Sequence, residues 1–261
     1  MYFLIMILSS CVDALCLLSP LELAADWDNV GLLLEAGGDV RRIMLTLDVT
    51  RDVVTEAVDA KVDLLVAYHP PIFTGMKRLV TCDSMGSSLL RLLDANISVF
   101  SPHTALDAAP GGVSDWLALG LPDSVVTPLE GSGRFLAFTA PTTVDALMDR
   151  FSIFLDLPYI RYAQAAGSNK SIRTMALCPG AGASVLREVE ADLVFTGEMR
   201  HHDVLSLSQR GVHVLLSEHS HTERPYLPVY RKRLLDLFPP EVEILVSSAD
   251  RDPIHLSASR A

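Results

Sequence analysis

Side chains that could bind a metal ion follow three separate apolar runs of the sequence. They are His69 after "LLVAY", His103 and Asp107 after "ISVFSP", and His219 and Glu223 after "VHVLLSE". Neutral imidazole and carboxylate oxygen are borderline-to-hard donors, so this set suits a divalent transition metal. Two carboxylates could also bridge a pair of ions ~3.5–4 Å apart, as in many hydrolases that activate water, and spacing alone does not count the metals.

Each candidate also has an ordinary structural interpretation. A histidine such as His69 before "PPIF" often donates to a loop carbonyl, and Asp107 in "HTALDAAPGG" could occupy a turn or a cap. The joint placement favours chemistry, because three strands each deliver candidates just past their carboxyl ends. That edge is where open α/β sheets bind ligands.

Glu223 has a sharper structural alternative, since the stretch "SHTE" that it ends matches the capping box, in which the glutamate only caps a helix. With Ser220 as the N-cap, Pro225 would fall at the fifth helical position, where it removes a hydrogen bond and clashes with the preceding turn. With Thr222 as the N-cap, Pro225 lies at the third position, which is cheaper by roughly 3 kcal/mol. We therefore expect a helix over about 223–237 and a Glu223 side chain that points toward the strand ends.

A further polar cluster lies in "TGEMRHHD" (196–203), after another predicted strand. Glu198, His201 and His202 could support the metal ligands or face a substrate, and they could equally be polar residues at the start of a surface helix. We carry His201 and His202 forward as candidates for proton transfer.

Strand-like and helix-like segments alternate along the whole chain. Apolar runs predict strands over 42–49, 63–69, 97–103, 134–140, 172–177, 192–198, 212–218 and 241–247. Helical spacing and caps predict helices over 9–18, 50–60, 84–95, 111–120, 142–155, 182–190, 201–210 and 223–237. Thr50 is the predicted cap of 50–60, and either Thr142 or Thr143 that of 142–155. Alternating βα units imply an α/β fold whose parallel strand pairs are covered by helices on both faces.

The stretch "LPDSVVTPLEGSG" (121–133) is the best candidate for a join, because glycine and proline interrupt the pattern there. We place a first α/β half at 1–125 and a second at 126–261. The C-terminal segment could pack back on the first half, and we expect the metal site in the cleft between the halves.

Composition limits the possible partners. The 261 residues are 49% hydrophobic and 20% charged, which is typical of a folded protein with a core. The formal net charge of −11 opposes direct binding of nucleic acid, which depends on clustered Lys and Arg. The start "MYFLIMIL" resembles a short secretion signal but lacks a basic segment before it. No later run reaches the ~18 apolar residues of a membrane span.

None of the four cysteines forms the C-x-x-C spacing of a zinc or redox motif. We therefore expect reduced thiols and a cytoplasmic location, with the nucleus and the mitochondrion left open. The cysteine pattern also argues against thiolate zinc and iron–sulfur sites.

Six ordered motifs together resemble the Nif-three-like family, also called YbgI-type proteins or GTP cyclohydrolase I type 2 homologues. They are "WDNVGLLLE" (27–35), "LTLDVT" (45–50), "YHPPIF" (68–73), "PHTALDAAPGGVSDWLA" (102–118), "TGEMRHHDVL" (196–205) and "EHSHTERPYL" (218–227). The likeness spans nearly the whole chain. The Tyr-His-Pro-Pro form looks like that of eukaryotic members, and the short link at 121–133 leaves no room for the extra domain that longer relatives insert.

The resemblance implies two similar, intertwined α/β halves with mixed sheets flanked by helices, a dinuclear metal site between them and a toroidal homohexamer. By motif, the metal ligands would be His69, His103, Asp107, His219 and Glu223, with Glu223 bridging the ions. We expect one or two divalent ions per chain, drawn from Zn, Fe, Mn and Ni. Bacterial members often carry His-His where this chain has Tyr68-His69. A phenol is a poor ligand at neutral pH, so Tyr68 could instead hydrogen-bond water at the metal or face away.

Two hypotheses of different class follow. The first is a metal-dependent hydrolase acting on a small nucleotide- or pterin-like substrate, with water activated by lowering its pKa toward ~7. Its candidate catalytic residues are Glu223, His201, His202 and Tyr68. The second is a metal-binding regulatory or adaptor protein with transcription-related protein partners, and metal delivery to another protein is a third possible role.

Overall fold

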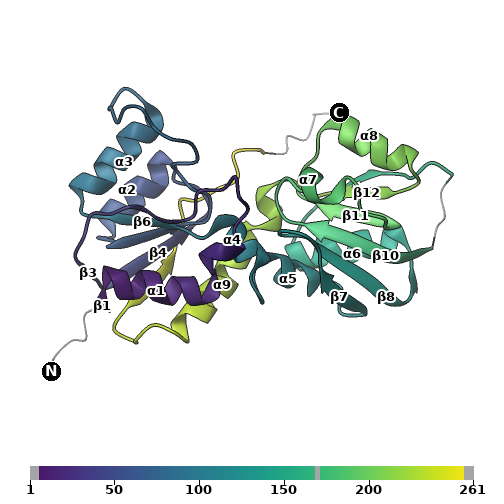
Figure 1. The fold of residues 1–261 in the computed structure, drawn as a ribbon, viewed down its shortest axis with the longest axis horizontal. Helices are drawn as coiled ribbons and strands as arrows, with labels where there is room; N and C mark the ends of the chain where they lie inside the picture. Colours follow the sequence, from purple (N-terminus) through teal and green to yellow (C-terminus); the bar gives the residue numbers. More distant parts are fainter. Residues whose placement is uncertain (1–5, 168–170, 256–261) are drawn as a thin grey trace.

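Two lobes, each built on its own β-sheet, make up the computed structural model, which describes residues 6–167 and 171–255 (Figure 1). Most of the signal-like start "MYFLIMIL" lies outside the described residues. Where the description begins, β1 (Met6–Ile7) pairs with β3 (Asp39–Val40) at the edge of the first lobe. Within the described residues, none of the helices has the length and hydrophobicity needed to cross a bilayer.

The sheet of the first lobe has five strands, four of them parallel. Its order is β13 (Glu243–Val246), β4 (Arg42–Thr46), β5 (Leu64–Ala67), β6 (Ser98–Ser101) and β2 (Gly31–Leu34). Strands β13, β4, β5 and β6 run parallel, and β2 is antiparallel to β6. The carboxyl ends of the parallel strands therefore meet at one edge of the sheet.

The sheet of the second lobe has six strands. Its order is β7 (Ser124–Pro128), β8 (Arg134–Thr142), β10 (Ile172–Cys178), β11 (Leu193–Thr196), β12 (His213–Leu216) and β9 (Arg161–Ala163). The central strands β10, β11 and β12 are parallel, and the outer ones are antiparallel to their neighbours. The predicted α/β class with mixed sheets is confirmed.

Helices cover both faces of the first sheet. Figure 1 shows α2 (Arg51–Asp59) and α3 (Ser84–Asp94) on one side of it, with α1 (Leu8–Leu18) and α9 (Leu227–Leu235) on the other. Alternate residues of one strand serve the two faces: Met44 packs in the cluster under α2 and α3, whereas Ile43 and Leu45 pack in the cluster under α1 and α9. This doubly covered arrangement explains why β5 is apolar at every position and why Ile43, Met44 and Leu45 of β4 are apolar in succession.

The second sheet follows the same rule. Helices α7 (Ala183–Leu186) and α8 (His201–Gln209) cover one face, where Val194 and Leu207 pack together. Helix α6 (Val144–Leu155) covers the other, and its Phe151 stacks on Phe195 with ring centroids 3.9 Å apart.

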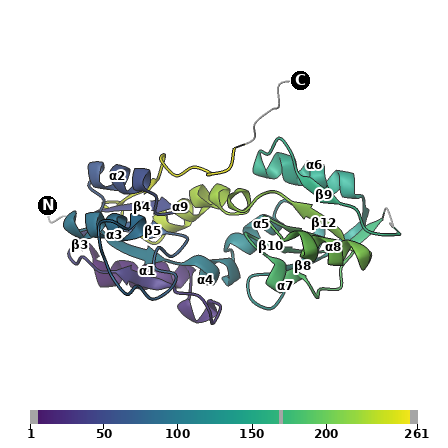
Figure 2. The ribbon, with the colours of Figure 1, turned by 90° about the horizontal axis from the view of Figure 1, so that it is seen from above.

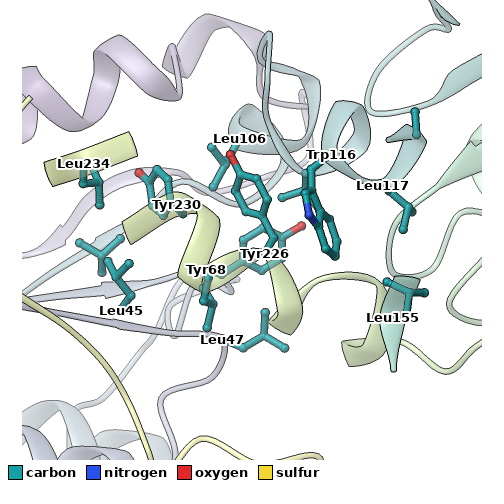
Figure 3. Close-up of a cluster of buried hydrophobic side chains, with 14 of the residues drawn as sticks. Leu45, Leu47, Tyr68, Leu106, Trp116, Leu117, Leu155, Tyr226, Tyr230 and Leu234 are labelled. Atoms are coloured by element: carbon teal, nitrogen blue, oxygen red, sulfur yellow. The ribbon is translucent and has the colours of Figure 1, made fainter. Parts of the chain in front are cut away.

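One hydrophobic core connects the lobes. It takes side chains from both sheets and from α4 (His103–Ala108), α5 (Val113–Ala118) and α9. Figure 3 shows this cluster, in which Tyr68 and Leu47 of the first lobe lie among Trp116, Tyr226 and Leu155. Because the core is continuous, packing fixes the edges of the two sheets relative to each other.

The chain returns to the first lobe at its end. In Figure 2, α9 lies beside β4 and β5 of the first lobe, and β13 then pairs with β4. A boundary between residues 125 and 126 stays a prediction. The stretch 121–133, predicted as a join, holds β7, which forms a hairpin with β8 closed by a bond from Leu129 N to Gly133 O of 3.0 Å. The β-branched residues of "SVVTP" explain the strand.

Two predicted caps are confirmed, and three predicted helices need correction. Thr50 caps α2 by accepting from Val53 N, and of the two candidates Thr142 and Thr143 it is Thr143 that caps α6, by accepting from Ala146 N. The predicted helix over 111–120 is α5 alone, preceded by the unpredicted α4, and the one over 182–190 shortens to the single turn of α7.

The predicted helix over 223–237 is wrong at its start. Two 3-10 turns, Ser220–Thr222 and Arg224–Tyr226, come first, and α9 begins only at Leu227. The physical reason is the pair of prolines: Pro225 is accommodated in a turn, and Pro228 falls in the first turn of α9, where no N–H is needed.

Candidate metal centre

The loops after parallel strands bring three histidines together between the lobes. His69 follows β5, His103 follows β6, and His219 follows β12 of the other sheet. The ring of His69 lies between the other two, with its centroid 5.4 Å from that of His103 and 5.3 Å from that of His219. Residues that follow strands of both sheets therefore meet at one place, as the sequence predicted.

Each imidazole is held through its Nδ1 atom by a carboxylate. The pairs are His69 with Asp48 at 2.9 Å, His103 with Asp28 at 2.8 Å, and His219 with Glu198 at 2.8 Å. A carboxylate on Nδ1 places the proton there and leaves the Nε2 lone pair available, which is the usual arrangement of metal-binding histidines. Asp28, Asp48 and Glu198 thus orient the three rings.

Glu223 lies between two of the rings. Its Oε2 is 3.4 Å from His69 Nε2, and its Oε1 is 3.3 Å from His219 Nε2. The residue is only 4% exposed, and none of the described residues forms a hydrogen bond with its Oε2. The Ser220 hydroxyl donates to Asp252, and the Glu223 N–H donates to the Ser220 carbonyl oxygen at 3.2 Å rather than to that hydroxyl, so the capping-box alternative does not describe this turn.

The carboxylate of Glu223 and the imidazoles of His69 and His219 stabilise each other's charged forms. Burial alone would raise the pKa of Glu223, but its close contacts with the imidazoles of His219 and His69 outweigh burial and lower that pKa to about 2. Burial opposes a charge on the imidazoles, yet contacts with Asp48 and Glu223 raise the pKa of His69 to about 10. Contacts with Glu223 and Glu198 likewise raise the pKa of His219 to about 9.

The donors of His69, His219 and Glu223 fit a metal ion. One ligand atom from each lies within 4.8 Å of the others. Ligands bound at about 2.0–2.1 Å in a tetrahedron are roughly 3.4 Å apart, close to the N–O separations above. Gly180 gives the group its room, since at φ +60° a Cβ there would overlap Glu223 Oε1 and lie 3.0 Å from His219 Nε2.

His103 and Asp107 extend the centre on the other side of His69. Asp107 is 5% exposed and accepts a hydrogen bond from the Tyr68 hydroxyl. The Tyr68 ring lies edge-on to His103, with centroids 5.5 Å apart. Tyr68 therefore neither faces away nor reaches toward solvent, and its polar atom is committed to Asp107.

The backbone is unusual beside two of the candidate ligands. His103 has φ +25°, and Glu218, which precedes His219, has φ +70°. Non-glycine residues pay a conformational cost at positive φ, and such residues gather at functional sites. His103 is held there by its N–H, which donates to Tyr68 O at 3.2 Å.

A cavity of about 1040 Å³ opens onto the centre. Its wall includes His69, His103, Asp107, His219 and Glu223 together with the loops 23–27, 129–132 and 178–181. Residues from both lobes thus enclose a volume that can hold a small organic molecule next to the imidazoles.

His201 and His202 do not join this group. Both are exposed at the start of α8, with their rings 5.3 Å apart, and His201 lines a separate smaller pocket beside Arg161 and Tyr162. Sequence reasoning also missed Asp28 and Asp48 as partners of the imidazoles. These two residues lie in the motifs "WDNVG" and "LTLDVT", but their distance along the sequence from His103 and His69 follows no pattern that would predict the contact.

Known proteins are similar to this chain along most of its length. The family described as Duf34/NIF3 (NGG1p interacting factor 3) matches residues 6–253. "Protein NIF3 homolog" of Schizosaccharomyces pombe is 40% identical, over 89% of this chain and 92% of that protein. "NGG1-interacting factor 3" of Saccharomyces cerevisiae is 34% identical, over 87% of this chain and 89% of that protein.

Solved structures share the fold. The crystal structure of a Bacillus cereus protein related to NIF3 has a TM-score of 0.82 at 18% identity, over 96% of this chain and 99% of that one. The resemblance carried by the six sequence motifs is confirmed, and the chain belongs to the Duf34/NIF3 family.

Proposed function

We propose that the protein is a divalent-metal-dependent hydrolase acting on a small nucleotide-like substrate, with His69, His219 and Glu223 as metal ligands. The observation that supports this most is Glu223 Oε2, a buried carboxylate oxygen without a hydrogen bond to any residue that the structure describes, which lies 3.4 Å from an oriented imidazole. A buried charge of this kind is costly unless it is compensated. The imidazoles of His69 and His219 compensate it when they are protonated, and a divalent cation held by Glu223 and by their Nε2 atoms would take over that role.

His103 and Asp107 are proposed as ligands of a second ion. A bridge by Glu223 between the two ions stays a prediction, because its oxygens face His69 and His219, which are both proposed ligands of the first ion. The ions considered are Zn, Fe, Mn and Ni, because imidazole and carboxylate donors accept several first-row metals.

The roles of the chain's own residues follow from their contacts. Asp48, Asp28 and Glu198 hold protons on the Nδ1 atoms and so keep the Nε2 atoms directed at the centre. A divalent cation there would supply a Lewis acid and lower the pKa of nearby water. Proton transfer by His201 or His202 stays a prediction that their exposed position on α8 does not support.

The test is turnover by the purified chain loaded with Mn²⁺, Fe²⁺ or Zn²⁺ on a panel of nucleosides, nucleotides, pterins and phosphoesters. Glu223→Gln keeps the size of the side chain but removes its charge, so it should abolish turnover and bound metal together. His255→Ala changes an exposed histidine far along the chain and should leave both unchanged. Absence of turnover under every metal would overturn the hydrolase.

A regulatory or adaptor role is the second candidate. It is favoured by the name of the Saccharomyces cerevisiae relative, which describes that protein as an interacting factor of NGG1. Affinity capture from nuclear extract would support this role if one partner, at stoichiometric amount, binds the wild type and Glu223→Gln equally. The homohexamer stays a prediction, to be checked by the mass of the particle in solution.

A further inference from the structure

The chain ends on a segment that crosses from one lobe toward the other beside the metal centre. After β13 this segment leaves the first lobe and reaches the loop that follows β12 in the second (Figure 1, Figure 2). At its start, Ser247 N donates to Leu45 O of β4 at 2.8 Å. At its other end, Asp252 accepts from the Ser220 hydroxyl. The segment 247–252 is therefore tied to loops of both lobes.

Asp250 lies within this crossing, and its carboxylate is buried. The side chain is 1% exposed, and its two oxygens face different loops. Oδ2 accepts from Leu47 N at 2.7 Å, and Oδ1 accepts from Arg224 Nη2 at 3.1 Å. Its own N–H donates to the Ser247 hydroxyl at 3.1 Å. One buried carboxylate thus joins the loop after β4 to the turn that carries Glu223.

Arg224 is the partner of that carboxylate, and it follows Glu223 directly in the chain. Its Nη2 also lies 4.0 Å from Asp48 Oδ2, and its Nη1 lies 4.0 Å from Asp252 Oδ2. The other oxygen of Asp48 is the one that holds His69 Nδ1 at 2.9 Å. The guanidinium therefore lies between the carboxylate that orients His69 and the acidic residues of the crossing segment.

The burial of this ion pair makes its loss costly. Breaking a buried pair by removing one charge destabilises a structure far more than breaking a surface pair. Loss of either charge would leave the other without its hydrogen-bonded partner, and the Arg224 side chain itself is only 21% exposed. The turn would then rearrange to reach another partner or solvent. Glu223 would move with it, because the two residues are adjacent.

Neither Arg224 nor Asp250 lines the cavity at the metal centre. A direct contact with a substrate in that cavity is therefore not their role. Their contacts lead instead to Glu223 and, through Asp48, to His69.

We propose that Arg224 and Asp250 are positioning residues of the metal centre, whose ion pair holds Glu223 in register with His69. The segment 247–252 thereby sets the spacing of ligands that come from separate loops. This role rests on the proposed function, since Glu223 and His69 are its metal ligands.

The first measurement is the Zn²⁺ affinity of the full-length chain, by competition against a chromogenic chelator. Arg224→Gln and Asp250→Asn each remove a charge, and each should lower the affinity by about 10- to 100-fold, the range for residues that orient metal ligands. Arg224→Lys should stay within about threefold of the wild type, because lysine supplies the charge that a single contact needs. Wild-type affinity in Arg224→Gln would overturn the proposal.

Glu56→Gln serves as the control for loosening of the same segment. Glu56 holds that segment from α2, where it accepts from Ser248 N and Ala249 N. Its replacement should lower the stability of the fold and leave the Zn²⁺ affinity unchanged. An equal loss of affinity in Glu56→Gln and Asp250→Asn would mean that any loosening of the segment weakens the centre, and the ion pair would then have no positioning role.

Two further readouts separate positioning from stability. The visible absorption of bound Co²⁺ depends on the geometry of its ligands, so the spectrum should change in Arg224→Gln and return in Arg224→Lys. In the metal-free protein, hydrogen exchange over 217–226 should become faster in Arg224→Gln and Asp250→Asn but not in Glu56→Gln. A lower urea midpoint with unchanged spectrum and exchange would show that the pair supports only the fold.

Failure of this proposal can be told from failure of the hydrolase. Weaker metal binding in the variants, without turnover by the wild type, would overturn the hydrolase and leave the role of Arg224 and Asp250 standing. Turnover by a wild type whose metal affinity equals that of Arg224→Gln would do the reverse. A wild type that binds no divalent ion would overturn both.

Discussion

The phenol of Tyr68 donates a hydrogen bond to the carboxylate of Asp107 inside the core between the lobes. Burial and the charge of Glu223 raise the pKa of Asp107 to about 7, and burial raises the pKa of Tyr68 well above its usual value. The phenol therefore keeps its proton and competes with any cation for Asp107. Because Asp107 is a proposed ligand of the second ion, this competition should weaken the binding of that ion.

Replacing Tyr68 should change the number of ions that bind tightly. In the wild type we expect one tight equivalent of Zn²⁺ or Mn²⁺ and a weaker second one. Tyr68→Phe leaves a buried oxygen of Asp107 without its donor, which should destabilise the metal-free protein by about 1–3 kcal/mol. It should also strengthen the second equivalent, because the carboxylate no longer has a competitor. Calorimetric titration with elemental analysis measures both, and identical titrations of wild type and variant would contradict this.

The carboxylates behind the imidazoles should matter almost as much as the ligands. Asp48→Asn keeps the size of the side chain but loses the charge that holds His69, so metal affinity should fall by about 10- to 100-fold. Glu198→Gln should lower the affinity by a similar factor, because the two carboxylates hold their imidazoles at similar distances and are exposed to a similar degree, 43% for Asp48 and 48% for Glu198. Competition against a chromogenic chelator measures the two affinities. Wild-type affinity in Asp48→Asn would mean that the ring of His69 is fixed by packing alone.

Periodicity and caps predicted most of the fold, since they depend on neighbouring residues. Apolar runs located the strands that end at the site, and Thr50 and Thr143 were found from local rules. Local rules failed at the start of α9, because either Pro225 or Pro228 can occupy the first turn of a helix and the sequence alone does not say which one does. The edge strand β7 was missed because glycine and proline on either side of it resemble a linker.

The candidate site was predictable only in part. A histidine or carboxylate just after a predicted strand indicates a ligand-binding edge of the sheet, and this position predicts His69 and Glu223 as metal ligands. Tyr68 and Asp107 are separated by 39 positions, and nothing local shows that a phenol will meet a carboxylate in the core. His201 and His202 show the converse failure, because a polar pair at a strand end can also begin an exposed helix.

Gly180→Ala should abolish metal binding without touching a ligand. A Cβ at this position would overlap Glu223 Oε1, and the residue has φ +60°. Gly131→Ala is the matched control, since Gly131 has φ +67° and open space around it. Both variants should lose about 1 kcal/mol of stability from the backbone conformation, but only Gly180→Ala should lose the metal. Equal metal content in the two variants would show that the loop moves to accommodate the methyl group.

The C-terminal segment should be held to the first lobe by a charge that acid removes. Glu56 on α2 accepts from Ser248 N at 2.9 Å, Ser248 Oγ at 2.6 Å and Ala249 N at 3.1 Å, just after β13. Burial alone would raise the pKa of Glu56, but these bonds and one from Ser247 lower it from 4.5 to about 2. The folded state therefore prefers the ionised carboxylate.

The sign of the pH dependence follows from that preference. A carboxyl whose pKa is lower in the folded state contributes stability above pH 4.5 and loses that contribution as the pH falls toward 2. Glu56→Gln should cost about 1 kcal/mol at pH 7, a value reduced by solvent screening, and the gap from wild type should close between pH 4.5 and pH 2. Urea midpoints across this range measure it, with the exposed Glu241→Gln as a control that should show no gap. A gap that persists at pH 2 would mean that Glu56 holds the segment by shape and neutral hydrogen bonds rather than by its charge.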